Sequence, residues 1–502
     1  VLMYIETFYF GNLSVYFVKY FYMYHVSDLK RFNKCPKLFY FDSISEKAVF
    51  QPYLRSDESF TDLLIERLGL KEYFRGTVGD EPKLFFDNYD SYEWFINSRM
   101  ENNGLRIRIP VIHKLRDKKI DVYFVYYGTH IKELDFFSLR VQYSALCDLG
   151  FDINEIYYVH INPDYVFHEH HDVSKLFVFE KRFKQVRFIN LVKEDKVDYN
   201  SIIKEMENNC LDDYESVRNR SCRSMKLCPY YSLCFPEVNN IEDNSILTLV
   251  SSRYKQQMYE SGILKLKDAD INLIEGNRVQ YAQIMADKNG GLFVDGPALK
   301  YWLKMVKEPV SYIDFEWDRY LIPRYENMKP LDVIPFEYVL YTQERGELVN
   351  KSFLSKGDCR REFVESLIND LPDEGSILAY NADGAECLRL KELQREFPEY
   401  SDKLGKIISR FVDLAVPFVE GLVYDVRMAG NFSLKKLVAI LSDESYENLD
   451  INEGMKAVYS WRDIDKEIDT DEEKTIEELK KYCGLDAYGL VIVYRWLREI
   501  DM

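Results

Sequence analysis

Apolar and polar side chains alternate over residues 312–316, where one aromatic residue separates Asp314 from Glu316. Strand side chains point alternately to two faces, so the pattern predicts a strand with both carboxylates on one face and Ile313 and Phe315 on the other. Adjacent carboxylates repel each other unless a cation lies between them. Their hard oxygens suit magnesium or manganese. The stretch is therefore either the solvated acidic face of an edge strand or part of a metal site.

A short strand and a helix follow this acidic stretch in the sequence. Ile377 to Tyr380 is an apolar run that predicts a strand, and Asn381 follows it directly. Cys387 to Phe397 has the pattern of a helix. Asp383 and Glu386 lie between the two elements, and each is a candidate for a further carboxylate.

The C-terminal region predicts one long helix over Glu477 to Leu497, where apolar residues recur at helical spacing. Tyr482 and Asp486 are four residues apart, so they lie on one face of this helix. A carboxylate strand, an acid after a second strand and a Tyr-x-x-x-Asp helix together are much rarer than any one of them.

These motifs together resemble the DnaQ-like 3′–5′ exonucleases of the DEDD type, in the tyrosine subclass. The connecting sequence is also similar to a bacterial family of uncharacterised proteins that joins an iron–sulfur nuclease-like domain to such an exonuclease. This similarity extends over nearly the whole chain from about residue 23. The matching segments are Phe315-Glu316, Ile322-Pro323, Pro330, Ile334-Pro335-Phe336, Tyr380-Asn381-Ala382, Val412-Asp413-Leu414 and Tyr482-Cys483.

The resemblance implies a two-metal-ion mechanism with two Mg²⁺ or Mn²⁺ ions. It assigns Asp314 as the ligand that bridges both ions, and Glu316 and Asp486 as further ligands of the first. Tyr482 is expected to orient the attacking water. The spacing of the family motif favours Glu386 as the remaining catalytic acid, with Asp383 as the competing candidate.

Two further positions are expected to bind substrate, Trp317 and Asn381. Trp317 stands where the exonucleases usually have Thr, beside the place of the terminal nucleotide. Its indole either stacks on a base or blocks the pocket. Tyr341 similarly replaces a usual His.

Four cysteines indicate a second kind of centre. Cys35 lies early in the chain, and Cys222, Cys228 and Cys234 follow much later with five residues between neighbours. This arrangement resembles the RecB-like, PD-(D/E)XK iron–sulfur nucleases and implies one 4Fe–4S cluster. Thiolates suit iron–sulfur clusters or zinc, but the spacing is not that of a zinc ribbon.

The same N-terminal region departs from the nuclease pattern at its catalytic positions. The predicted strand Leu105–Ile112 has Pro110 where the metal-binding Asp is expected. The next predicted strand, Ile120–Tyr127, has Phe124 and Tyr126 in place of Glu and Lys. We therefore expect an inactive nuclease fold that serves as a scaffold or guides nucleic acid.

Two other segments of this region are candidates for a functional role. His168, His170 and His171 follow a turn signal, and the absence of partner ligands at useful spacing favours a solvated loop over a metal site. Phe177 to Phe188 is strand-rich and interleaves basic with aromatic residues. It is either a basic face for a phosphate backbone or an ordinary solvated strand pair.

Length and charge set the remaining limits. A chain of 502 residues is too long for one ordinary core. The net charge of −18 argues against broad electrostatic binding of nucleic acid or of an anionic membrane, so a nuclease needs local basic patches and metal ions here. Nine cysteines, an odd number, do not suggest a disulfide scaffold, and a reducing cytoplasm fits better.

The sequence thus predicts a multidomain α/β protein with an iron–sulfur PD-(D/E)XK-like fold, a helical connector and an RNase H-like, DnaQ-like exonuclease domain. The expected divisions are an upstream extension over 1–22, with Met23 as the natural start, then 23–240, 241–308 and 309–502. In the connector, Leu247–Tyr259 is expected to form one helix.

The expected function is 3′–5′ exonuclease action on DNA or RNA, without a membrane. The alternatives are an inactive architectural nucleic-acid-binding protein and, more weakly supported, a hydrolase of a small phosphodiester. The choice between DNA and RNA, between single and double strands, and among repair, RNA processing and defence stays open.

Overall fold

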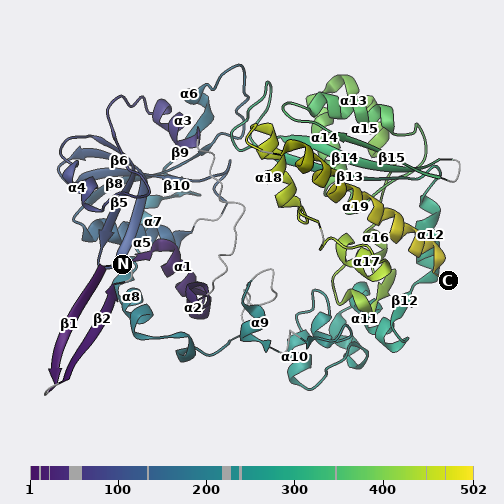
Figure 1. The fold of residues 1–502 in the computed structure, drawn as a ribbon, viewed down its shortest axis with the longest axis horizontal. Coiled ribbons are helices and arrows are strands. Elements are labelled where there is room, and N and C mark those ends of the chain that lie inside the picture. The colour runs from purple at the N-terminus through teal and green to yellow at the C-terminus, as the bar shows by residue number, and fades with distance from the viewer. Residues whose placement is uncertain are drawn as a thin grey trace. The chain divides into compact units, whose positions relative to one another are not determined.

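The chain divides into two compact units in the computed structural model (Figure 1). Unit 1 comprises Val1–Pro236 and Leu321–Leu331, and unit 2 comprises Glu237–Tyr320 and Asp332–Met502. The expected connector, 241–308, belongs to unit 2. The structure describes residues 2–10, 13–21, 23–44, 59–132, 135–217, 228–236, 240–344, 347–447, 449–469 and 471–500.

Unit 1 is built on a seven-stranded mixed sheet in the order β4-β5-β6-β7-β8-β9, with β3 paired to β6. A separate antiparallel pair, β1 and β2, forms from the N-terminal residues. The strands are β1 (Leu2–Phe10), β2 (Leu13–Phe21), β3 (Tyr24–His25), β4 (Phe74–Arg75), β5 (Trp94–Asn102), β6 (Leu105–Arg116), β7 (Lys119–Val125), β8 (Asp152–Ile161), β9 (Phe177–Glu180), β10 (Arg182–Phe183) and β11 (Val186–Arg187).

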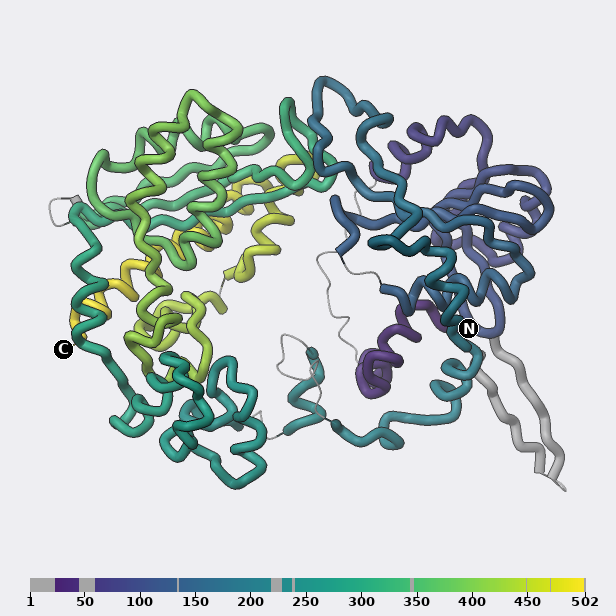
Figure 2. The backbone as a smooth tube through the Cα atoms, turned by 180° about the vertical axis from the view of Figure 1, so that it is seen from behind, coloured from purple at the N-terminus to yellow at the C-terminus, as the bar shows by residue number. Residues whose placement is uncertain are grey.

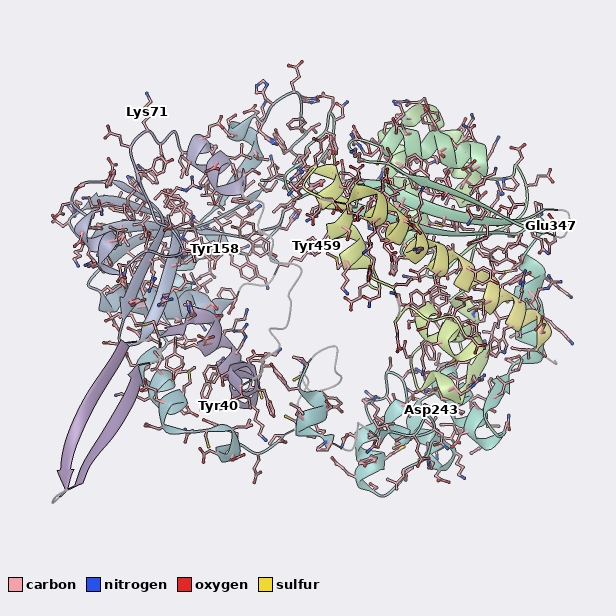
Figure 3. The ribbon with its side chains drawn as sticks, viewed as in Figure 1. Tyr40, Lys71, Tyr158, Asp243, Glu347 and Tyr459 are labelled. Carbon is pink, nitrogen blue, oxygen red and sulfur yellow. The ribbon has the colours of Figure 1, made fainter. Side chains whose placement is uncertain are left out.

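Helices cover the two faces of this sheet unequally. The helices are α1 (Val26–Lys34), α2 (Pro36–Ile44), α3 (Ser59–Arg67), α4 (Lys83–Asp87), α5 (Phe136–Asp148), α6 (Val173–Leu176), α7 (Phe188–Lys193), α8 (Tyr199–Asn208) and α9 (Tyr231–Cys234). One face packs on α1, α5, α7 and α8 in a large core that includes Tyr158, labelled in Figure 3. The other face packs on α3 through Phe60, Leu64 and Ile65.

Unit 2 contains a five-stranded sheet in the order β15-β14-β13-β16-β17. Strands β13 and β14 are antiparallel, whereas β13, β16 and β17 run parallel. Its strands and the further pair β12 and β18 are β12 (Leu292–Val294), β13 (Ser311–Arg319), β14 (Val333–Glu344), β15 (Glu347–Leu354), β16 (Ile377–Ala379), β17 (Phe411–Asp413) and β18 (Val423–Asp425).

Helices lie on both faces of the five-stranded sheet (Figure 1). Helices α13, α14 and α15 pack on the face that contains Ile313 and Phe315, and α17 and α19 pack on the opposite face. The helices of unit 2 are α10 (Lys255–Glu260), α11 (Arg278–Lys288), α12 (Gly296–Met305), α13 (Arg360–Asp370), α14 (Glu386–Glu396), α15 (Ser401–Ile408), α16 (Val416–Val419), α17 (Leu434–Leu441), α18 (Gly454–Asp465) and α19 (Glu472–Glu499). In Figure 2 the chain of unit 2 can be followed through these helices in sequence order, from teal to yellow.

The sequence predicts the class correctly, because both units are mixed α/β and each has its own sheet. The single helix expected over Leu247–Tyr259 is wrong. A 3₁₀ turn occupies Ile246–Thr248 and α10 begins only at Lys255. Ser251 between them has a left-handed backbone with φ of 50°, which a continuous right-handed helix cannot contain.

No helix in the described ranges is both long and apolar enough to cross a bilayer.

Candidate metal and catalytic site

Three carboxylates converge on one face of the five-stranded sheet in unit 2. Asp314 and Glu316 alternate with core residues on β13, and Asp486 comes from α19, which packs against that strand. Ligand oxygens of the three side chains all lie within 4.8 Å of one another. Strand β13 is the middle strand of five, so the solvated edge strand considered from the sequence is excluded.

Helix α19 presents this chemistry because its apolar stripe lies on the sheet. It is longer than expected, from Glu472 to Glu499, and Asp471 caps it by accepting a hydrogen bond from the Lys474 backbone N–H. Tyr482 and Asp486 face inward, where their side chains are 4% and 8% exposed. The expected i, i+4 pair therefore lies at the acidic strand.

Glu386 lies at the start of α14 and is buried, whereas Asp383 is exposed three residues earlier. The Glu386 charge helps to raise the pKa of Asp314 and of Glu316, so its carboxyl belongs to the same acidic group. Its Oε2 atom is buried without a hydrogen-bond partner among the described residues. A bound cation is one way to satisfy such an atom.

The electrostatics of the group favour protons or cations. Burial, followed by repulsion from Asp486, Glu316 and Glu386, raises the pKa of Asp314 well above its usual range. Burial and Asp486 do the same to the pKa of Glu316. Burial also raises the pKa of Glu386 to about 8. Four clustered carboxyls cannot all ionise cheaply without positive charge, and their hard oxygens fit Mg²⁺ or Mn²⁺.

Lys435 and Tyr446 complete the surroundings of Tyr482 and Asp486. Lys435 Nζ donates a hydrogen bond to the Tyr482 hydroxyl at 3.0 Å and another to the Asn452 carbonyl at 2.7 Å. The Tyr446 hydroxyl donates to Asp486 Oδ1 at 2.7 Å. The Lys435 ammonium also lies over both tyrosine rings, at 4.8 Å from the centroid of Tyr446 and 4.6 Å from that of Tyr482.

The sequence did not single out these two residues. Lys435 lies in the first turn of α17, where the cap by Ser433 predicted only the start of a helix. Tyr446 lies after α17 outside any regular element, and no local pattern distinguishes it from the other tyrosines of the chain.

Glu337 and Cys483 also border the site and were not foreseen. Glu337 pairs across the sheet with Glu316, and both its carboxylate oxygens are buried without a hydrogen-bond partner in the described structure. Burial raises its pKa to about 8. The Cys483 thiol donates weakly to the Asp314 backbone oxygen at 3.4 Å and to Oδ2 at 3.5 Å. Burial raises the thiol pKa well above its usual range, which keeps Cys483 a neutral donor.

The two residues expected to contact substrate differ in exposure. Trp317 is half-buried after a register shift in β13, and the Arg389 guanidinium lies 5.1 Å from its ring centroid. Asn381 is exposed in a left-handed conformation with φ of 60°, and its backbone N–H donates to Asp413 Oδ1 at 2.8 Å. Asp413 thus fixes the turn that leads to Glu386.

The predicted cysteine ligands lie in unit 1. Cys35 separates α1 from α2, Cys228 precedes the short helix α9, and Cys234 is the last residue of that helix. The segment between the last two packs on α2, because Tyr230 stacks on Phe41 and donates a hydrogen bond to Asp42 at 2.6 Å. This packing ties the two regions of cysteine together.

The fourth predicted ligand, Cys222, lies outside the described residues. Tyr40 of α2, labelled in Figure 3, anchors the preceding segment by donating to the carbonyls of Met206 and Asn209.

The expected catalytic positions of unit 1 hold no acids. Phe124 is buried in β7 and stacks on Tyr158 at a centroid distance of 5.5 Å. Tyr126 packs against the same core, and Pro110 is half-buried in β6.

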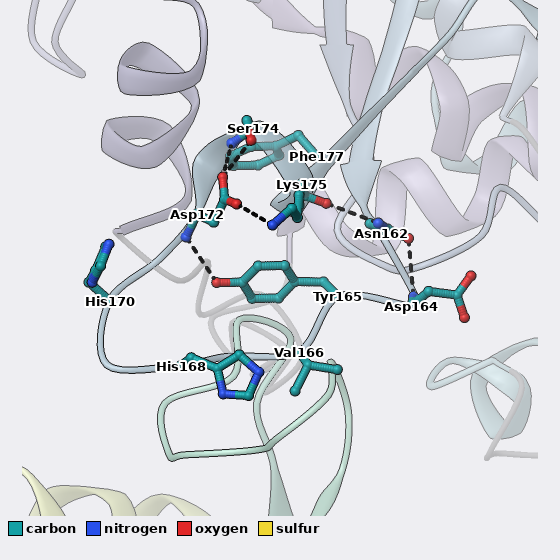
Figure 4. Close-up of a pocket in the computed structure, with 10 residues that line it drawn as sticks. All are labelled: Asn162, Asp164, Tyr165, Val166, His168, His170, Asp172, Ser174, Lys175 and Phe177. Carbon is teal, nitrogen blue, oxygen red and sulfur yellow. Dashed lines mark hydrogen bonds and ion pairs between the residues drawn. The ribbon is translucent and has the colours of Figure 1, made fainter.

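The histidine-rich loop lines a pocket of about 600 Å³ in unit 1 (Figure 4). Its charges are largely paired. Lys175 contacts Asp172 at 2.8 Å, and His168 contacts Glu326 at 2.6 Å. Among the described residues, His168, His170 and His171 join no group of three clustered metal-ligating atoms.

Comparison with known proteins identifies one matching family, described as a domain of unknown function (DUF2779), over residues 311–433. No curated protein matches the chain. Among solved structures, the chain is similar to the family B DNA polymerase from the hyperthermophilic archaeon Pyrobaculum calidifontis, at 18% identity and a TM-score of 0.26. That similarity covers 38% of this chain and 24% of the polymerase.

Proposed function

We propose that the chain is a metal-dependent 3′–5′ exonuclease that hydrolyses phosphodiester bonds of DNA or RNA in unit 2. The convergence of Asp314, Glu316 and Asp486 supports this proposal more than any other observation. Glu386 adds a fourth acid and Tyr482 a buried hydroxyl, so the group contains the side chains that the DEDD resemblance requires. A group of carboxylates alone does not indicate an exonuclease. The placement of these acids and of Tyr482 on a strand and on the helix that packs against it supports this activity more strongly.

The acids of the chain have a direct part in this mechanism. Asp314, Glu316 and Asp486 would hold the ions. Glu386 would contribute its Oε2 atom, which is buried without a hydrogen-bond partner among the described residues. When bound, two divalent ions lower the pKa of the attacking water and stabilise the leaving 3′-oxygen. The partial exposure of Asp314 and Glu316 leaves them accessible to ions and water.

Tyr482 is suited to orient the water. Its burial and the nearby Asp486 charge raise the pKa of its phenol, so it stays protonated at neutral pH. Lys435 donates to the phenol oxygen, and this leaves the phenol hydrogen free to be donated. In the described structure the Tyr482 hydroxyl makes this hydrogen bond with Asp486, which places the phenol beside the carboxylate where the water is proposed to bind.

Unit 1 is proposed to be an iron–sulfur domain that has lost nuclease activity and binds the substrate strand. Cys35, Cys222, Cys228 and Cys234 would hold one 4Fe–4S cluster, which would tie the ends of the unit together. The contacts of Tyr230 with α2 support this ligand set. Anaerobically purified protein is expected to contain iron and acid-labile sulfide. Cys35→Ser should remove both, whereas Cys147→Ser should not.

The exonuclease proposal is tested with 3′- and 5′-labelled single-stranded DNA and RNA, in manganese or in chelator. Stepwise loss from the 3′ end is expected for the parent and for Asp383→Asn. Asp314→Asn and Glu386→Gln should lose on the order of 100-fold or more in rate, because ion-mediated stabilisation is worth several kcal/mol. Absence of cleavage by the parent, with strand binding intact, would instead favour the architectural alternative.

A further inference from the structure

A row of aromatic side chains crosses the α3-facing side of the sheet in unit 1. We call it the aromatic row, and its members are Trp94, His113, Tyr123, Tyr157 and Phe179. They come from five strands, β5 to β9, whose pairing places Trp94 opposite His113 and Tyr123 opposite Tyr157. Side chains that point to one face of neighbouring strands form such a row directly.

The rings are arranged in stacks. The ring centroids of Trp94 and His113 lie 3.9 Å apart, and the angle between the two ring planes is 4°. The ring centroids of Tyr123 and Tyr157 lie 4.4 Å apart, with an interplanar angle of 6°. Trp94 also contacts Tyr123 at 5.9 Å, which joins the two stacks. Phe179 meets Tyr123 edge to face at 6.2 Å and extends the row to β9.

Helix α3 and apolar residues of the segments 165–176 and 321–322 cover the centre of this face. The covered part is a core that includes Ile96, Val111 and Val159. Four members of the row, all except Tyr123, are only half-buried around that core. Aromatic rings that are partly exposed at the border of a sheet core can stack on the bases of a single strand.

Two cations border the row without acidic partners. Lys181 Nζ lies 4.8 Å from the Tyr157 centroid, and the Arg67 guanidinium lies 5.5 Å from that of Phe179. Within the described ranges neither forms an ion pair, and Arg67 Nε is buried without a hydrogen-bond partner. Both side chains therefore keep their charge available to an anion.

The acids on the same face are already engaged. Glu155 is buried and paired with Arg187, and Asp121 accepts a hydrogen bond from the Asn154 amide at 2.8 Å. Glu93 contacts His113 at 2.9 Å. The charges that border Phe179 and Tyr157 are those of Arg67 and Lys181, which are positive and complement phosphates.

We propose that the aromatic row, with Lys181 and Arg67, binds single-stranded nucleic acid by stacking bases and pairing phosphates. This inference rests on the proposed function, because it gives unit 1 the strand on which unit 2 would act. The positions expected for a nuclease centre, Phe124 and Tyr126, have side chains on the opposite face, so the row is a different surface.

The test uses the full chain with Asp314→Asn, in chelator, so that neither cleavage nor metal contributes. Fluorescence anisotropy of labelled 12-nucleotide dT and rU strands measures binding and distinguishes DNA from RNA. Tyr157→Leu and Lys181→Gln are expected to weaken binding by about tenfold each, the first because it removes a stacked base and the second because it removes a phosphate contact. Addition of the strand should also quench Trp94 emission, and Trp94→Phe should lose that component.

Two control variants match the test residues in chemistry. Tyr301→Leu removes a 70% exposed tyrosine from α12, and Lys193→Gln removes an exposed lysine from α7, on the other face of the unit 1 sheet. Neither should change affinity. Lys181 is exposed, so its substitution should leave the melting temperature unchanged and separate binding from folding.

The outcomes distinguish this inference from the proposed function. Unchanged affinity in both Tyr157→Leu and Lys181→Gln would overturn it, even if the parent cleaves strands. Binding of a labelled poly-glutamate peptide without any strand binding would also overturn it and indicate an acidic protein partner. If strand binding depends on the aromatic row but the parent cleaves nothing, the result would support strand binding by the row and reject the proposed exonuclease activity.

Discussion

At the scale of single residues, Lys435 is a cation that partly balances the charge of the candidate site. Its charge opposes the rise in the pKa of Glu316 and of Asp486, and its ammonium donates to the Tyr482 hydroxyl. Removal of the ammonium should therefore leave Tyr482 less well oriented and the carboxylates less well compensated. A side chain with this position has more influence on turnover than on folding.

Lys435→Met is expected to lower kcat by about 10- to 100-fold, since a hydrogen bond from a charged donor is worth about 1.5–3 kcal/mol. The Michaelis constant should change little, because Lys435 contacts Tyr482, whose proposed role is to orient water and not to bind substrate. Single-turnover and steady-state rates in manganese measure both. The neighbouring Lys436→Met is the control and should behave like the parent. A loss confined to KM would contradict the positioning role.

Glu337 predicts a pH dependence of the metal-free protein. Burial raises its pKa from 4.5 to about 8, so the native state retains a proton that the unfolded state releases above pH 4.5. The free energy of unfolding should therefore fall as pH rises from 4.5 towards 8, by up to about 1.4 kcal/mol per pH unit for this group. Below pH 4.5 both states bind the proton and the effect vanishes.

Glu337→Gln should flatten this slope by the contribution of one proton and stabilise the metal-free protein at pH 8. Denaturant unfolding in chelator between pH 5 and 8 measures the slope. The exposed Glu347→Gln on β15 is the control and should keep the slope of the parent. A slope equal to that of the parent in Glu337→Gln would show that Glu337 is ionised in the native state.

At the scale of elements, the site depends on how closely α17 approaches α19. Gly489 allows this approach, because a Cβ atom there would lie 2.7 Å from Val438 Cγ2 and 3.5 Å from Leu434 Cδ1. Valine has little rotamer freedom in a helix, so α17 itself would have to move. Lys435 lies on the same helix and would move with it.

Gly489→Ala should therefore lower both stability and turnover. Overpacking costs about 1–3 kcal/mol, equivalent to several degrees in melting temperature. Gly484→Ala in the same helix is the matched control, because a Cβ atom there meets nothing within 4 Å. It should raise the stability by up to about 1 kcal/mol through helix propensity. Thermal melts and cleavage rates of both variants test this, and equal behaviour of the two would contradict it.

The elements near the acids were the most predictable from sequence. Strict alternation over β13 and helical spacing over α19 depend on local side chains, so Asp314, Glu316 and Asp486 could be assigned to their faces. The break between Leu247 and Tyr259 could not be foreseen, because its apolar residues suit a helix, whereas the backbone is extended at Leu249 and left-handed at Ser251.

The site residues that the sequence did not indicate escaped prediction for one physical reason. Lys435, Tyr446 and Glu337 reach the acids through tertiary packing of segments whose local pattern is ordinary. Glu337 even follows the alternation of a strand, but the sequence does not indicate that its partner across the sheet is Glu316. Register between strands, which sets this pairing, is a property of the folded chain.

At the scale of the whole molecule, a net charge of −18 opposes the nucleic-acid binding that we propose for unit 1. Only local cations can offset the general repulsion, and Arg67 and Lys181 lie beside the aromatic row with Arg182 and Lys184 nearby in sequence. Stacking rather than charge should then supply most of the affinity. The salt dependence of binding measures this division directly.

For single strands, the slope of log affinity against log salt is about −0.7 for each phosphate neutralised. Two to four cations predict a slope between about −1 and −3 for the Asp314→Asn chain in chelator. Lys181→Gln should make it shallower by about 0.7, and Tyr157→Leu should lower affinity without changing it. A slope of about −5 or steeper would place the strand on a wide basic surface instead, because no set of two to four cations releases that many counterions.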